Sequence, residues 1–368
     1  MALQPMFISG WKQLSAYLYC NNSYFDMKKI VLFNHKGGVS KTTSTFHIGW
    51  MLANLGKKVL LVDADPQCNL TSLFLGDKFD EYFDEDSPTV NNNIKDGVWP
   101  AFTGSATQIR PFECPKAERN HNLFLLPGHM NLSECDSPLS FAITSNYMPL
   151  QSLPGSFNDL IEKCAEQYNI DYVFIDLNPG LSAINQILFL CSDAFIVPTN
   201  PDSFSVMSIK SLASILPRWV EWKNSNISHY ATSPYPLPLS TPSFIGVIPQ
   251  RFNVRNGSAT KPFREKIAEQ IDIIKTLFVP ELQKKDMIYS NAEYDNAGID
   301  RKTFCLEEIK DFLTLSPKSL RINVPVFELS DDELSAVGTV LKSAQENRET
   351  FRAIYSTIAE KIMKICHD

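Results

Sequence analysis

The residues from Asn34 to Thr43 have the types and spacing needed to bind a chain of phosphates. They read Asn-His-Lys-Gly-Gly-Val-Ser-Lys-Thr-Thr and follow a short apolar run, Lys29–Phe33. Glycines let the backbone turn its N–H groups towards phosphate oxygens, and a helix that starts there adds a favourable dipole end. In this arrangement Lys41 can reach the outer phosphates, and the Thr42 hydroxyl can ligate Mg²⁺.

This segment departs from the strict phosphate-loop pattern G-x-x-x-x-G-K-[ST] at two positions. His35 stands in place of the first glycine and Ser40 in place of the second. The sequence fits instead the variant K-G-G-x-x-K-T-T, which has a second lysine at Lys36. A glycine-rich turn with solvated lysines is the alternative, but the position between an apolar strand and a helix favours a nucleotide site.

Carboxylates follow two other apolar runs. Asp63 and Asp65 come after Lys58–Val62, and Asp176 comes directly after Tyr172–Ile175. Because the carboxyl ends of parallel strands meet at one edge of a sheet, these side chains should face the same crevice as the phosphate loop. An Asx turn or a helix cap is the alternative explanation for the Asp-x-Asp-Pro sequence.

An alternation of strands and helices must position these groups. Further strands are predicted at Asn122–Leu126, Ala194–Pro198, Phe244–Ile248 and, at a sheet edge, Pro325–Leu329. Helices are predicted at Thr42–Leu55, Phe157–Gln167, Phe204–Trp222, Lys261–Leu277, Asp331–Gly338 and Lys342–Cys366. This order predicts an α/β fold, a doubly wound and mostly parallel sheet with helices on both faces.

The chain of 368 residues, 44% of them hydrophobic, can bury a large core without a disulfide or a metal. We expect a single domain over 27–368 that ends in C-terminal helices at 331–366. An N-terminal extension over 1–26 is either an upstream-start artefact or a packed segment. Surface insertions are expected at 77–120, which is acidic and then polar, and at 224–243, which is rich in serine and proline.

Composition excludes several classes of protein. The net charge of −7 excludes a basic surface over the whole molecule, so any contact with DNA requires a local patch. The eight cysteines include no Cys-x-x-Cys pair and no zinc-finger spacing. No apolar run reaches the length of a membrane span, and residues 1–26 do not have the pattern of a secretory signal. We therefore expect a cytoplasmic protein with reduced thiols.

Together these motifs resemble the ParA/MinD family of P-loop ATPases, which have a deviant Walker A motif. Val62–Thr71 is similar to the family segment D-x-D-P-Q-x-N-x-T, and Asp171–Gly180 is similar to its Walker B strand. The resemblance covers roughly Lys28–Gln250, with gaps at the insertions. Three residues depart from the Thr or Ser and two prolines that usually follow the Walker B aspartate: Leu177, Asn178 and Gly180.

The resemblance implies that the chain binds Mg-ATP, hydrolyses it slowly and forms a homodimer in the ATP state. Asp65 would position the attacking water, and Lys36 would reach the phosphates of the partner's nucleotide, much as an arginine finger does. Mg²⁺ would be held by Thr42, Asp63 and Asp176. The nucleotide-binding residues would be Lys36, Gly37, Gly38, Val39, Ser40, Lys41, Thr42 and Thr43, with Gln250 and Arg251 at the adenine.

Partner surfaces are less specific in the sequence. Arg251–Lys266 carries a local excess of positive charge, which is either a site for DNA without sequence preference or a solvated helix face. The apolar stripe from Phe351 to Ile365 favours core packing over a membrane-targeting helix, so membrane binding is not expected.

The resemblance implies partitioning of DNA, or positioning of a cargo, with a cognate adaptor protein. A regulatory or anti-phage defence ATPase that recruits a protein effector is the alternative. An iron–sulfur reductase shares this type of phosphate loop, but Cys68 and Cys191 lack the companion cysteines that a cluster requires.

Overall fold

The computed structural model describes residues 27–366 apart from 106, 146, 253, 256, 257 and 260, with side chains described outside 251–261. The strands of this part form an eight-stranded sheet in the order β10-β7-β6-β1-β5-β2-β4-β3, and β8 and β9 pair separately. Only β3 and β4 are antiparallel among the neighbours in the large sheet. The strands are β1 (Lys28–Leu32), β2 (Val59–Ala64), β3 (Lys116–Ala117), β4 (Asn120–Leu126), β5 (Tyr172–Leu177), β6 (Ala194–Thr199), β7 (Ser243–Phe252), β8 (Val254–Arg255), β9 (Ser258–Ala259) and β10 (Ile309–Lys310).

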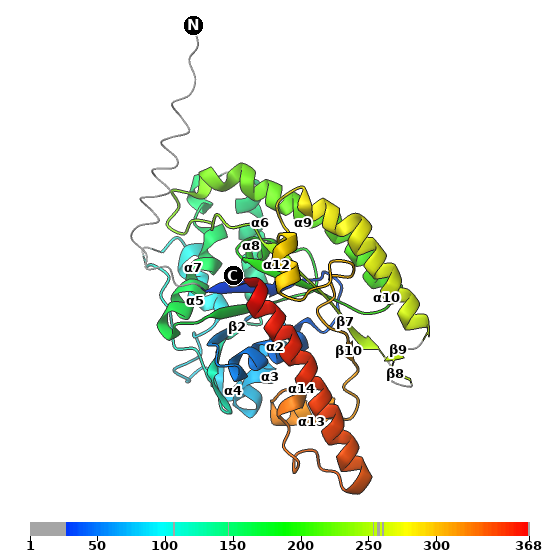
Figure 1. Ribbon diagram of the computed structural model, residues 1–368. Helices are drawn as coiled ribbons and strands as arrows, with labels where there is room; N and C mark the ends of the chain where they lie inside the picture. Colours follow the sequence, from blue (N-terminus) through cyan, green and yellow to red (C-terminus); the bar gives the residue numbers. More distant parts are fainter. Residues whose placement is uncertain are drawn as a thin grey trace.

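Helices cover both faces of the sheet, with α7, α8 and α9 on one side and α2 and α14 on the other (Figure 1). The α-helices are α2 (Lys41–Asn54), α3 (Asn69–Leu75), α4 (Phe79–Tyr82), α5 (Ile94–Phe102), α6 (Asp136–Thr144), α7 (Leu153–Tyr168), α8 (Ala183–Leu190), α9 (Ser203–Tyr230), α10 (Lys261–Ile273), α11 (Val279–Gln283), α12 (Asn291–Asn296), α13 (Leu315–Ile322) and α14 (Gly338–Cys366). Short helices of other types are η1 (Gly76–Lys78), η2 (Leu132–Cys135), η3 (Met148–Leu150), η4 (Ile274–Phe278) and η5 (Val326–Glu328). The doubly wound, mostly parallel sheet predicted from the sequence is confirmed.

The central strands are buried on both faces, which explains why they read as continuous apolar runs. Every residue of β2, β5 and β6 is buried. The parallel register pairs Leu32 of β1 with Asp176 of β5, and Asp63 of β2 with the same Asp176. Three neighbouring strands therefore end together, and the polar residues that follow them meet at one edge of the sheet.

The segment 77–120, predicted to be a surface insertion, also contributes to the core. It contains α4 and α5, and α5 packs against α7. Ile94 and Val98 are fully buried, and the Asn93 side chain caps α5 by accepting a hydrogen bond from the backbone N–H of Asp96 at 2.9 Å. The spacing of four residues between the two buried side chains is helical, but the surrounding polar residues hid that pattern in the sequence.

The loop predicted at 224–243 begins later than expected, because α9 continues to Tyr230. Tyr230 is buried, and its hydroxyl donates a hydrogen bond to the carbonyl of Ala142 at 3.1 Å. Two turns earlier lies Lys223, whose buried Nζ donates to the carbonyls of Leu190 and Ser240. These contacts hold the end of the helix and the following loop against α6 and α8.

The C-terminal region differs from the prediction in two places. Pro325–Leu329 is not an edge strand, since Val326–Glu328 forms the short helix η5 and the edge position belongs to β10. Residues Asp331–Gly338 form turns and irregular backbone instead of a helix, and α14 begins at Gly338. A tertiary contact holds η5, because the N–H of Val326 donates to the side chain of His47 in α2 at 3.2 Å.

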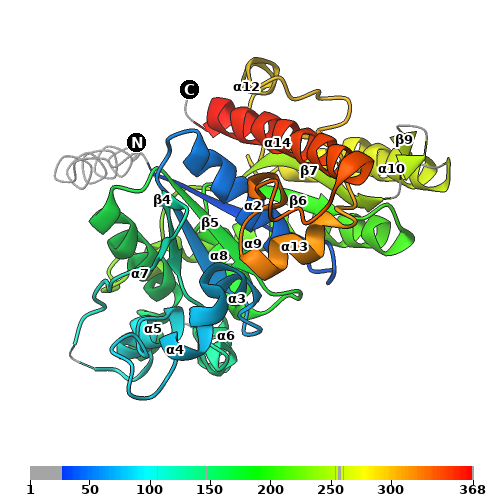
Figure 2. The same cartoon turned by 90° about the horizontal axis from the view of Figure 1, so that it is seen from below.

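Helix α14 lies against α2 (Figure 2), and its apolar stripe joins the core, as predicted. Five of its members are buried: Phe351, Tyr355, Ile358, Ile362 and Ile365. Among the described residues, no helix is long and apolar enough to cross a membrane.

Candidate nucleotide site

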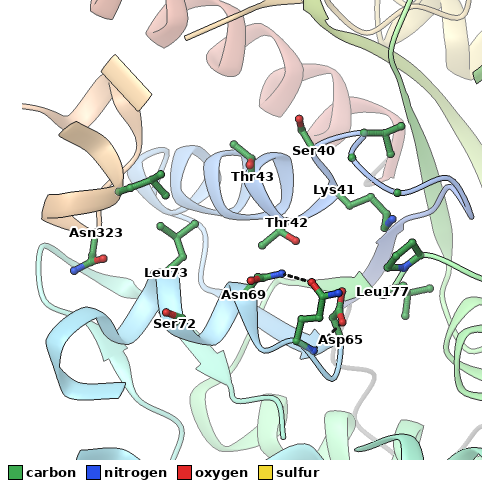
Figure 3. A pocket seen from close by; sticks show the side chains of 16 residues that line it. Ser40, Lys41, Thr42, Thr43, Asp65, Asn69, Ser72, Leu73, Leu177 and Asn323 are labelled. Atoms are coloured by element: carbon green, nitrogen blue, oxygen red, sulfur yellow. Dashed lines mark hydrogen bonds between the residues drawn. The ribbon is translucent and has the colours of Figure 1, made fainter. Parts of the chain in front are cut away.

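A cavity of about 570 Å³ opens at the carboxyl edge of the sheet, beside the predicted phosphate loop. Lys41 and Thr42 at the start of α2, Asp65 after β2, and Asn69 on α3 surround it (Figure 3). Asn323, at the end of α13, closes its far side. Its lining includes every residue of 37–43. The structure therefore brings the loop and the Asp65 carboxylate together around one space.

Asn34 holds the phosphate loop from within. Its side chain is fully buried, and Nδ2 donates to the carbonyl of Pro198, at the end of β6, at 2.9 Å. Its Oδ1 accepts a hydrogen bond from the backbone N–H of Lys36 at 3.0 Å. Gly38 and Ser40 have φ angles of 73° and 56°, in the left-handed region that glycine adopts freely and serine adopts with strain. The backbone between them turns around the mouth of the cavity.

The N-terminus of α2 is suited to an anion. Ser40 occupies the N-cap position without a side-chain capping bond, and no acidic residue lies in the first turn. The first N–H groups of a helix have no partner within the helix and carry a partial positive charge. Lys41 lies 7% exposed, with Nζ donating to the Asn34 carbonyl at 3.0 Å. Burial lowers the pKa of Lys41, although Asp176 and Asp65 oppose this effect.

Asp176 is a buried carboxylate at the end of β5. It is 1% exposed, and neither carboxylate oxygen has a hydrogen-bond partner in good geometry within the described residues. Burial raises its pKa to about 8; Asp63 on the neighbouring strand adds to the shift, and the nearby Thr42 hydroxyl and Lys41 oppose it. A buried carboxylate without donors is costly unless a cation or a proton neutralises it. The pair Thr42 and Asp176 thus fits a divalent cation.

Asp63 and Asp65 lie in different surroundings. Asp63 is fully buried, and its Oδ2 accepts hydrogen bonds from the N–H of Thr71 at 2.8 Å and from its hydroxyl at 2.6 Å. Its Oδ1 accepts from the N–H of Asp65 at 3.2 Å. Burial raises the pKa of Asp63 to about 6, and these hydrogen bonds limit the rise. Asp63 therefore shapes the turn that presents Asp65 to the cavity.

Lys36 is held within its own chain. Its Nζ lies 2.9 Å from Oδ2 of Asp202, and the lysine side chain is only 17% exposed. The other oxygen of Asp202 accepts a hydrogen bond from the N–H of Ser205 at 2.7 Å and so caps α9. The pKa of Asp202 is lowered. Burial alone would raise it, but the hydrogen bonds that Lys36 and Ser205 donate lower it by more.

A smaller cavity of about 220 Å³ adjoins the start of α2 where the adenine was predicted. Ser40, Thr43, Gln250 and Asp311 are among the residues around it. The Gln250 side chain is 2% exposed and is engaged internally, since its Oε1 accepts from the Ser44 hydroxyl at 3.0 Å. The side chain of Arg251 lies outside the described residues.

Two asparagines that the sequence analysis did not single out support the site. Asn200 donates through Nδ2 to the carbonyl of Gly38 at 2.9 Å. Asn185 donates to the carbonyls of Asn178 and Gly180 at 3.0 and 3.1 Å. The bonds from Asn185 fix the loop after Asp176, where the family usually has two prolines, and the bond from Asn200 holds the phosphate loop. No sequence motif marks either residue. Asn200 lies 162 positions from Gly38 and meets it only in the folded chain, and Asn185 bonds across a turn of five to seven residues.

A family model described as an AAA domain matches residues 27–229 of the chain. The chain belongs to the ParA/MinD-type P-loop ATPases. It is 28% identical over 190 residues to the virulence plasmid ParA family protein pGP5-D of Chlamydia psittaci, over 50% of this chain and 62% of that protein. It is 31% identical over 183 residues to the maintenance of carboxysome distribution protein A of Gloeothece citriformis, over 50% of this chain and 60% of that protein. The chain thus spans less than two thirds of the length of these relatives.

The matches to solved structures of the same fold cover more of this chain than the matches to these relatives do. Cyanthece apo McdA matches with a TM-score of 0.54 and 22% identity, over 87% of this chain and 99% of McdA. A putative plasmid partition protein (BB_S35) of Borrelia burgdorferi, bound to AMPPNP, matches with a TM-score of 0.52 and 20% identity, over 88% of this chain and 98% of that one. Both likenesses show the shared fold.

Proposed function

We propose that this ParA-type ATPase binds Mg-ATP, dimerises in the ATP state and partitions DNA or positions another cargo together with an adaptor protein. The observation that carries the proposal is the unpartnered Asp176 carboxylate behind a loop that contains both Lys36 and Lys41. Relatives named for a plasmid ParA family and for carboxysome distribution support the same kind of role.

The residues around the cavity fit a triphosphate with its metal. The N–H groups of 37–43 and the Lys41 ammonium group would bind the phosphates, while the Thr42 hydroxyl and Asp176 would hold Mg²⁺. No cluster of three His, Cys, Asp or Glu side chains that could hold a metal occurs in the described part of the chain. A cation that depends mainly on phosphate oxygens and water, as Mg²⁺ does, suits such a site. The adjoining cavity near Gln250 would take the base.

Hydrolysis would rest on positioning and charge stabilisation. Oδ1 of Asp65 accepts the N–H of Gln67 at 2.9 Å, which leaves the other carboxylate oxygen for the cavity. That oxygen would orient a water for in-line attack on the terminal phosphorus while the bond to the ADP oxygen breaks. Lys36 would stabilise the developing charge from the second subunit, so it must first leave Asp202.

ATPase measurements and sedimentation of wild type, Lys36→Ala and Asp65→Ala test this proposal. We expect Asp65→Ala to remain a dimer with ATP, because it binds the nucleotide without hydrolysing it. Lys36→Ala should remain a monomer and lose most activity. Lys57→Ala, which removes a lysine beyond the far end of α2, is the matched control. Normal dimerisation and wild-type hydrolysis by Lys36→Ala would falsify the role in trans.

Binding to DNA distinguishes partitioning from recruitment of a protein effector. Binding to non-specific duplex that requires ATP and weakens steeply with salt would support partitioning. Arg264→Glu on α10, an exposed position, should weaken that binding and leave ATP hydrolysis unchanged. If no DNA binds and a stable complex with a protein effector forms, the regulatory or defence role replaces the partition role.

A further inference from the structure

A third cavity, of about 490 Å³, lies outside the nucleotide site, and Asn323 lines both this cavity and the one beside the phosphate loop. Its walls come from three separate parts of the fold. The end of α3 with η1 forms one wall, residues 115–119 around the edge strand β3 form another, and residues 321–324 at the end of α13 form the third. Trp50 of α2 also lines it. Its volume lies within the range of small-molecule sites, about 300–1,000 Å³.

Trp50 has a hydrogen-bond donor without a partner. Its side chain is 2% exposed, and the indole Nε1–H makes no hydrogen bond within the described residues. In contrast, the indole of Trp222 donates to the carbonyl of Ile143 at 3.1 Å. Buried polar groups are paired in most native structures, because an unpaired one loses its hydration without compensation. The N–H itself is closed to solvent, so Trp50 contributes the apolar surface of its ring to the cavity wall.

The charge of the lining favours an anion. Four cationic side chains face two anionic ones, although the whole chain carries a net charge of −7. They are Lys78, Lys116, Arg119 and Arg321 on one side and Asp77 and Glu118 on the other. Lys78 pairs with Glu118, and Arg119 pairs with Glu333. Arg321 is exposed and has no ion pair or hydrogen bond within the described residues, so its charge is available to a ligand.

Apolar groups complete the lining, since Phe74, Leu75 and Tyr82 also lie against the cavity. We propose that this cavity is an effector site for a small anionic ligand with a planar, apolar body. The apolar part contacts the aromatic side chains, Trp50 among them, and the acidic group pairs with Arg321.

The cavity is placed to communicate with the nucleotide site. Asn323 separates the two spaces, and its side chain packs directly on Gly76, where a Cβ added to the glycine would lie 2.0 Å from the Asn323 Nδ2. Gly76 also ends α3, the helix that follows the Asp65 turn, and Trp50 belongs to α2, the helix of the phosphate loop. A ligand that moves Asn323 or α3 therefore changes the affinity for ATP. This coupling rests on the proposed function, whereas binding to the cavity does not.

The fluorescent anion 8-anilinonaphthalene-1-sulfonate, added to the full chain, tests the site. Bound at this cavity, it receives excitation energy from Trp50, so Trp50→Phe should reduce the transfer more than Trp222→Phe does. Arg321→Ala should weaken binding about tenfold, the usual effect of losing one charge-assisted hydrogen bond. The uncharged analogue N-phenyl-1-naphthylamine should bind wild type and Arg321→Ala equally. A reduction of transfer in Trp50→Phe no larger than in Trp222→Phe, or sulfonate binding that is insensitive to Arg321→Ala, overturns the proposal.

Calorimetry of ATP binding with and without the sulfonate tests the coupling. Linkage requires that each ligand change the affinity for the other by the same factor. We expect a change of about fivefold in wild type, within the usual range of such couplings, and a smaller one in Gly76→Ala, which displaces Asn323. Sulfonate binding without any effect on ATP overturns the coupling. Sulfonate binding to a protein that does not bind ATP contradicts the proposed function and leaves the cavity site intact.

Discussion

Two clusters of buried charged side chains lie at opposite ends of the parallel strands, one at the amino ends and one at the carboxyl ends. They differ in whether neighbouring groups neutralise the charge. At the amino edge, Lys29 is 5% exposed and donates to Asn158 and Glu162, both at 2.6 Å. Burial disfavours the charged form of Lys29, but the attraction of Glu162 and Asp193 is stronger, so the pKa of Lys29 is raised. At the carboxyl edge, Lys41 is 7% exposed and its pKa is lowered by burial.

The difference lies in the partners. Near Lys29 the carboxylates are engaged, since the Asp193 side chain accepts from the backbone N–H of Lys29 at 2.9 Å. Near Lys41 the Asp176 carboxylate has no donor in good geometry. A buried ionic group that the fold satisfies is structural, whereas one that it leaves unsatisfied is kept for a ligand. Four predictions follow from this difference, ordered from the largest expected effect to the smallest.

Asp176→Asn should make the nucleotide-free protein more stable and inactive. Its folded pKa of about 8 lies above the unfolded value of about 3.9, so the unfolded state releases its proton first and stability falls progressively as pH rises between these values. At pH 7 we expect the free energy of unfolding in urea to rise by roughly 2–4 kcal/mol. ATP hydrolysis should fall at least ~100-fold, because a metal ligand is lost. Asp193→Asn at the other edge should lower stability and leave the activity of the folded fraction unchanged.

Lys29→Met should have the opposite pattern, with a loss of stability and no loss of nucleotide binding. The substitution leaves the buried Asn158 amide oxygen without its donor, while Glu162, whose side chain is 41% exposed, regains water. We expect the free energy of unfolding to fall by about 2 kcal/mol. The loss is no larger because solvent already screens the partly exposed Glu162. The affinity for ATP, measured by calorimetry, should stay within about twofold of wild type. A larger change would mean that the amino edge also serves the nucleotide site.

His47 of α2 shows that a satisfied titratable group also exists beside the nucleotide site. Its Nδ1 donates to the Thr43 carbonyl at 2.8 Å and its Nε2 accepts from Val326, an arrangement that requires the neutral ring. Burial lowers the pKa of His47 to about 3, below the unfolded value of about 6.5. Protons therefore bind the unfolded state first, and stability is lost as pH falls below about 6.5.

Between pH 7 and pH 5 this loss should be roughly 2 kcal/mol. Because other groups also titrate, the measurement is the difference between wild type and His47→Gln in urea unfolding at both pH values. The variant should start less stable and lose less on acidification. Equal losses in the two proteins would show that His47 does not contribute to the pH dependence.

Asp202→Asn should have the smallest effect, which is an easier release of Lys36 from its ion pair. Asparagine keeps the acceptor that caps α9 but weakens the hold on the lysine. A partly exposed ion pair of this kind contributes about 1 kcal/mol, so the ATP concentration needed for half-dimerisation should fall two- to fivefold. Asp202→Ala, which also removes the cap, should in addition lower stability by about 1 kcal/mol. Sedimentation at several ATP concentrations measures this effect, and an unchanged midpoint for Asp202→Asn would contradict it.

The sequence by itself determined the sheet and the phosphate loop. Lys36, Lys41 and Thr42 lie within one short segment, and Asp65 and Asp176 follow apolar runs, so local pattern and the geometry of parallel strands were sufficient to place them. The same reasoning failed for Pro325–Leu329, where a strand-like composition forms the helix η5. There the contact with His47, 279 residues away in the chain, decides the backbone conformation.

Only the tertiary structure decided which charges are satisfied. The pairing of Lys36 with Asp202 joins residues 166 positions apart, and no spacing rule predicts it. The same holds for Asn323, which α13 brings between the nucleotide cavity and the cavity at Trp50. Periodicity reports which side of a strand or helix is buried, because that depends on neighbours a few residues away. The partner of a buried polar group depends on the packing of distant elements, which exists only once the chain has folded.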